Sequence, residues 1–90
     1  MIYKIEASHL TIKRAKDIYR QGLLHFALAK EVTIDLSEVT KIDTSGVAVI
    51  VGWWRHAQKQ GVECKLVLSK VITEIFSSYH LSLPEMFKEA

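Results

Sequence analysis

The sequence has one cysteine, one proline and no long hydrophobic run. The single thiol, Cys64, cannot form a disulfide within the chain, so we expect a small core residue in a reducing compartment. The longest apolar run, Val47 to Trp54, is far shorter than the roughly 20 residues that span a bilayer. No signal peptide pattern precedes the first expected strand. The sequence therefore predicts a cytoplasmic protein without direct membrane insertion.

The sequence also has little excess of one charge sign over the other. Twelve Lys and Arg residues against ten Asp and Glu give a net charge of +2, so the basic excess typical of nucleic-acid binders is missing. A small basic cluster on the first expected helix is interpreted as a solvated face or as a weak attraction to an anionic partner; it consists of Lys13, Arg14, Lys16 and Arg20. The four histidines lack metal-ligand spacing; they are His9, His25, His56 and His80. We expect no nucleic-acid partner, no metal and no other cofactor.

Ninety residues, 49% of them hydrophobic, predict one domain over residues 1–90 with its own core. Apolar patterns predict strands over 2–7, 32–36 and 64–68, and the β-branched run at 32–36 predicts burial on both faces. Steps of three and four residues predict helices over 12–27, 45–60 and 70–79, with Thr11 and Ser69 as N-caps and Gly61 ending the second. This alternation predicts an α/β fold, with a small, mostly parallel sheet of three or four strands packed with three or four helices.

The most informative segment is Asp43-Thr44-Ser45-Gly46, which follows a strand and a short loop and opens an apolar helix. Unpaired N–H groups and a positive dipole make a helix N-terminus suited to present a hydroxyl or to hold a phosphate. Capping alone, worth about 1 kcal/mol, explains most such segments. In the alternative interpretation Thr44 is exposed and recognised by a partner, and phosphorylation would add about two negative charges there. No base accompanies these hydroxyls, so no catalytic residue is predicted.

Two adjacent tryptophans, Trp53 and Trp54, lie about 100° apart on the second helix. The inward face of this helix is predicted to consist of Val47, Ile50, Val51 and Trp54. Trp53 then falls at the border of that face, near Val49 and Ala57. It is either a second core residue or a partly exposed anchor for a partner protein.

The segment from Val32 to Gly61, with Asp43-Thr44-Ser45-Gly46 at its centre, resembles the STAS domain family. Flanking strands and helices extend the resemblance over essentially the whole chain. It implies a STAS-like fold and a non-enzymatic protein-interaction module. The partner surface that it implies consists of Asp43, Thr44, Ser45, Gly46, Val49 and Trp53. The family's usual first edge strand is missing here, so we expect an open sheet edge that could pair with a second copy of the chain.

Two groups within this family bear on the function. The small MlaB-like STAS subunit of Mla-type phospholipid ABC transporters has Asp-Thr-Gly-Gly, with its threonine at the contact with the ATPase subunit. Anti-sigma factor antagonists have Asp-Ser-Ser-Gly or Asp-Ser-Thr-Gly, and an anti-sigma factor serine kinase phosphorylates the first hydroxyl. Both positions correspond to Thr44, with Ser45 as the second candidate.

Thr44 and the ending Tyr79-His80-Leu81, with Leu83-Pro84, favour the transporter group, whereas Ser45 favours the antagonists. We therefore expect a subunit that binds and regulates or stabilises a transporter ATPase through Thr44, at the inner face of the membrane. The alternative is an antagonist that binds an anti-sigma kinase and is released by phosphorylation of Thr44.

Overall fold

A computed structural model describes residues 1–79 and 88–89 of the chain. Three helices are present in this part: α1 (Ile12–Leu28), α2 (Thr44–Gln60) and α3 (Lys70–Ser78). The main sheet has the order β1-β3-β5-β6, from strands β1 (Ile2–Lys4), β3 (Glu31–Asp35), β5 (Glu63–Val67) and β6 (Lys88–Glu89). A second sheet pairs two short strands, β2 (His9–Leu10) and β4 (Lys41–Ile42). Every strand pairing within these described residues is parallel.

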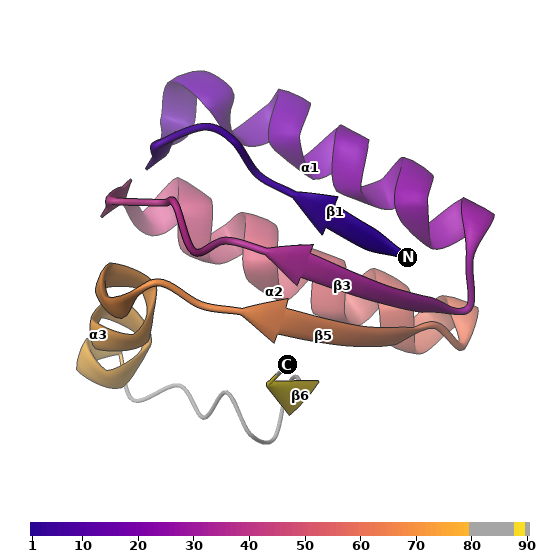
Figure 1. The fold of residues 1–90 in the computed structure, drawn as a ribbon. Coiled ribbons are helices and arrows are strands. Elements are labelled where there is room, and N and C mark those ends of the chain that lie inside the picture. Colours follow the sequence, from indigo (N-terminus) through magenta and orange to yellow (C-terminus); the bar gives the residue numbers. More distant parts are fainter. Residues whose placement is uncertain (80–87, 90) are drawn as a thin grey trace.

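The alternation of strands and helices gives the predicted α/β architecture. α1 and α2 lie along the same side of the main sheet, and α3 follows the carboxyl end of β5 (Figure 1). β1 pairs with β3 and, within the described residues, has no strand on its other side. Pairing of that edge with a second copy of the chain stays a prediction. Within the same residues, no helix is both long and apolar enough to cross a membrane.

Burial on both faces of the central strand was a wrong prediction. In β3, Val32 and Ile34 are at most 1% exposed, whereas the alternating Thr33 is only half-buried. β5 repeats the pattern, with Cys64 and Leu66 buried. Because successive side chains of a strand point to opposite faces, the helices cover only the face to which these apolar residues point.

α1 and α2 pack closely because glycines stand where they cross. A Cβ atom on Gly22 of α1 would lie within 3 Å of three atoms of the Trp53 indole. A Cβ atom on Gly52 of α2 would come within 2.9 Å of the Tyr19 ring. The indole Nε1–H of Trp53 donates a hydrogen bond of 3.0 Å to the backbone oxygen of Tyr19. Gly22 therefore makes room for the Trp53 indole, and Gly52 makes room for the Tyr19 ring.

The inward face of α2 differs from the prediction. Trp53 is fully buried, while Val51 and Trp54 are only half-buried. The buried residues of α2 are Gly46, Val47, Val49, Ile50, Trp53 and Ala57. Trp53 is thus a core residue, and its predicted alternative role as a partly exposed partner anchor is wrong. The physical reason is the space that Gly22 leaves on α1, which the sequence periodicity of α2 cannot reveal.

Cys64 is buried in the sheet, with 8% of its surface exposed. Burial raises the pKa of its thiol to about 12, whereas an unfolded thiol has a pKa of about 8.5. Below about pH 8.5 the thiol keeps its proton in both the native and the unfolded state, so the free energy of unfolding does not change with pH through this group. The free energy of unfolding falls as the pH rises from about 8.5 towards 12, because the unfolded chain then releases a proton that the native state keeps.

We predict that the urea midpoint falls more steeply above about pH 8.5 in the wild-type protein than in Cys64→Ala. Chemical denaturation at a series of pH values measures this. Parallel pH profiles of the two proteins would contradict the buried thiol. The native thiol should also react slowly with a disulfide reagent near neutral pH, and rapidly once urea unfolds the chain.

Candidate interaction site at the helix N-termini

Asp43 joins the N-termini of α1 and α2. Its Oδ1 accepts hydrogen bonds from the N–H groups of Ser45, at 2.9 Å, and Gly46, at 3.2 Å. Its Oδ2 accepts a hydrogen bond of 3.2 Å from the N–H of Ile12, the first residue of α1. One carboxylate therefore satisfies N–H groups at two helix starts that have no partner within their helices. Asp43 holds the first turn of α2, and so Thr44, in a fixed position.

The N-caps predicted for the other two helices stand at the predicted positions, but their side chains do not cap the helices. Thr11 precedes α1 and Ser69 precedes α3, yet neither side chain makes a capping hydrogen bond. At α1, Asp43 from a distant part of the chain binds the first N–H group instead. The sequence could not show this contact, because 31 positions separate Ile12 from Asp43.

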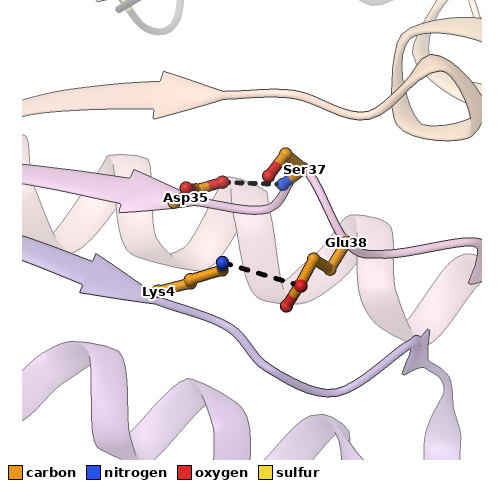
Figure 2. A network of polar contacts seen from close by, with 4 residues as sticks. All are labelled: Lys4, Asp35, Ser37 and Glu38. Carbon is orange, nitrogen blue, oxygen red and sulfur yellow. Dashed lines mark hydrogen bonds and ion pairs between the residues drawn. The ribbon is translucent and has the colours of Figure 1, made fainter.

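Polar contacts hold the loop that follows β3 (Figure 2). The hydroxyl and the N–H of Ser37 bind the Asp35 carboxylate and hold its pKa below the ordinary value, the N–H at 2.9 Å from Oδ1. Glu38 forms an exposed ion pair of 3.6 Å with Lys4 of β1. Farther along, the N–H of Thr40 donates to the backbone oxygen of Ser8 at 2.7 Å. These contacts hold the loop between β3 and β4 against β1 and against the segment that precedes β2.

Position 46 must be a glycine because β2 and β4 approach its backbone closely. A Cβ atom at this position would lie within 3 Å of the backbone oxygen of Leu10 and of the side chain of Ile42. The first turn of α2 can therefore rest on β2 and β4 only if residue 46 has no side chain. Gly46 is buried, so it shapes the surface beneath its neighbours. A contact between Gly46 itself and a partner stays a prediction.

Thr44 is the first residue of α2 and is exposed. Its hydroxyl has no hydrogen-bond partner among the described residues. Ser45, the next residue, is half-buried and faces a groove between α1 and α2. Thr44 is therefore the hydroxyl of the motif that is better placed to meet another protein.

The α1–α2 groove has a volume of about 330 Å³ and is largely apolar. It is lined by Ala15, Lys16 and Tyr19 of α1 and by Ser45, Ala48, Val49 and Gly52 of α2. Small side chains on both helices keep the groove open. Val49, which the sequence predicts as a contact residue, is 6% exposed and reaches the surface only as part of the groove floor.

Ile12 is a candidate contact residue that the sequence analysis missed. It belongs to the apolar stripe predicted for α1, yet it is 74% exposed. It stands at the start of α1, one turn before Lys16, and its N–H group binds the same carboxylate that caps α2. The available signal was its position at the helix start, before the first full turn. Ile12 is thus an apolar side chain available to a partner at the same end of the molecule as the exposed Thr44.

Two of the four histidines, His25 and His56, stack on aromatic rings. His25 stacks on Tyr3 with ring centroids 4.1 Å apart, and His56 stacks on Phe26 at 5.9 Å. Within residues 1–79 and 88–89, no group of three His, Cys, Asp or Glu residues is arranged to hold a metal ion. The sequence motif Tyr79-His80-Leu81 with Leu83-Pro84 lies outside the described residues, except for the exposed Tyr79.

Comparison with known proteins connects this geometry to a family. Residues 7–82 match the family model described as MlaB, STAS domain. No curated protein sequence matches the chain. Seven solved chains do match.

Two of these structures illustrate the likeness. A candidate anti-sigma factor antagonist from Thermotoga maritima has a TM-score of 0.77 and 18% identity, over 98% of this chain and 77% of the other. The anti-sigma factor antagonist SpoIIAA, in its unphosphorylated form, has a TM-score of 0.60 and 14% identity, over 84% of this chain and 68% of the other. Both confirm the predicted fold.

Proposed function

Because the chain belongs to the STAS domain family, whose members are protein-interaction modules, we propose that it is the STAS subunit of an Mla-type phospholipid ABC transporter. In this role it catalyses no reaction itself, and it binds and regulates or stabilises the ATPase subunit at the inner face of the membrane. The observation that carries the proposal is the match to the MlaB type of STAS domain over residues 7–82. The exposed Thr44 at the start of α2 supports it.

The geometry suits recognition of a neutral hydroxyl. The Thr44 side chain can both donate and accept a hydrogen bond, and it enters an interface without the desolvation cost of a charge. Asp43 fixes the backbone beneath it through three hydrogen bonds, so little conformational entropy is lost on binding. A phosphate or a carboxylate at residue 44 would place a charge in the same interface.

The second candidate function is that of an anti-sigma factor antagonist. Its support is that the two similar structures described above bear that description. In this case an anti-sigma factor serine kinase binds the unmodified protein and transfers phosphate to Thr44, and the added charge releases the complex. Ser45 is the weaker acceptor, since it is half-buried in the α1–α2 groove.

We predict that Thr44→Glu abolishes capture of the transporter ATPase and its permease from the native host. Glutamate is favourable in the first turn of a helix, so the fold of the variant should be intact. The matched control is Thr73→Glu, which adds the same charge to an exposed threonine near the start of α3. Affinity capture with quantitative mass spectrometry measures the recovered proteins.

Two results would count against binding of the ATPase through Thr44. Equal capture of the ATPase by wild type and Thr44→Glu would exclude the helix start as its binding site. Recovery of a serine kinase instead, with phosphate on Thr44 in the free protein, would establish the antagonist function.

A further inference from the structure

The fold separates charges that are well mixed along the sequence. α1 and α2 together contain six lysine and arginine residues and one carboxylate, Asp17, a net charge of +5 against +2 for the whole chain. The six cations are Lys13, Arg14, Lys16, Arg20, Arg55 and Lys59. α2 contains no Asp or Glu at all. The helical layer is therefore basic, and the rest of the chain is acidic.

Several of these cations stand along the α1–α2 groove. Lys16 lines it, and Arg20 follows one turn later on α1. Arg55 follows the groove residue Gly52 by one turn of α2. All three are exposed, and the ion pairs within the described residues, Lys4 with Glu38 and Lys70 with Glu74, involve none of them. The groove thus has an apolar floor between two basic rims, which have no carboxylate partners within the described part of the chain.

Resting on the proposed function, we propose that the α1–α2 groove binds an acidic amphipathic helix of the ATPase subunit. An apolar side chain of that helix rests on Ala48, Val49 and Gly52. Asp or Glu residues of the same helix pair with Lys16, Arg20 and Arg55. An amphipathic helix in an apolar groove is a recurring mode of recognition, and the rims add charge complementarity that speeds association and excludes basic partners.

A lipid surface fits these observations less well. Basic residues attract anionic headgroups, but the apolar floor is recessed between two helices, and Val49 is 6% exposed. An amphipathic helix presents an apolar side chain and carboxylates together, and so matches both the apolar floor and the basic rims.

The proposed acidic partner also implies that a negative charge at residue 44 would weaken binding. The groove begins at Ser45, beside Thr44, and Ile12 stands at the same end on α1. An acidic helix in the groove would be repelled by a phosphate or a carboxylate at residue 44. Modification of Thr44 would therefore weaken binding by charge repulsion as well as by loss of a hydroxyl contact.

Site-specific photo-crosslinking in the native host tests this inference. A benzoyl-phenylalanine at Ile12, which is exposed and one turn before Lys16, places the reactive group at the end of the groove. We expect the cross-linked peptide, mapped by mass spectrometry, to be an acidic amphipathic segment of the ATPase subunit. Adding Lys16→Glu and Arg20→Glu should reduce the yield by about tenfold, while Lys30→Glu, an exposed lysine after α1, should not.

The other outcomes separate this inference from the proposed function. An acidic amphipathic peptide from a protein other than an ATPase would keep the groove inference and overturn the transporter function. An ATPase peptide without acidic residues, or a yield that the charge reversals leave unchanged, would overturn the groove inference alone. A phospholipid adduct, or no adduct at all, would also overturn the inference.

Discussion

Replacing Trp53 by alanine is expected to lower the free energy of unfolding by about 3–5 kcal/mol. The side chain is fully buried between α1 and α2, and its Nε1–H donates to the backbone oxygen of Tyr19 at 3.0 Å. The substitution removes the largest fully buried side chain and leaves a cavity beside Gly22. Urea denaturation followed by circular dichroism measures the loss.

Trp54→Ala is the matched control, one residue away on the same helix. Trp54 is half-buried, and its Nε1 has no hydrogen-bond partner within the described residues. We expect a loss of about 1 kcal/mol, because less apolar surface is removed and an unsatisfied donor disappears with it. A larger loss for Trp54→Ala than for Trp53→Ala would contradict the orientation of α2, and would support the inward face that the sequence pattern predicts.

Asp43→Ala should lower the free energy of unfolding by about 2–3 kcal/mol, since it removes the capping acceptor of two helices at once. The carboxylate accepts hydrogen bonds from Ile12, Ser45 and Gly46, and no other acceptor at these distances is present in the described residues. Asp43→Asn should lose less, because its one remaining oxygen can still cap a single helix. Asp17→Ala, at an exposed acid of α1, serves as the control with a loss below about 0.5 kcal/mol.

Amide hydrogen exchange distinguishes a double cap from an ordinary one. In Asp43→Ala, protection should fall at Ile12 as well as at Ser45 and Gly46, because both helix starts lose their acceptor. Loss of protection in α2 alone would show that the bond to Ile12 contributes nothing to stability.

Local sequence signals predicted the three helices and the two inner strands correctly, whereas the first strand, predicted over 2–7, is observed only over Ile2–Lys4. The helix expected from about Ser45 to Gly61 is α2, and Gly61 ends it in the left-handed conformation, with a φ of 69°. The apolar patterns placed β3 and β5 within one residue of their observed ends. Such features depend on neighbouring residues, which the sequence displays directly.

Features that depend on distant residues were not predicted. Trp53 is buried because Gly22, 31 positions earlier, leaves space for it. Strands β2 and β4 have two residues each, which is too short to produce a periodic pattern. The exposure of Ile12 and the basic rims of the groove arise only when α1 and α2 lie side by side. Of the predicted contact residues, Thr44 is exposed as expected, and Trp53 is in the core.

The most direct test of the central claim is the affinity of the purified protein for the ATPase subunit of an Mla-type transporter from the same host. Isothermal titration calorimetry with wild type, Thr44→Glu and Thr73→Glu provides it. We expect wild type and Thr73→Glu to bind equally well, and Thr44→Glu to bind at least about tenfold more weakly. Equal affinity of all three proteins, or no binding by the wild type, would contradict binding of the ATPase through Thr44.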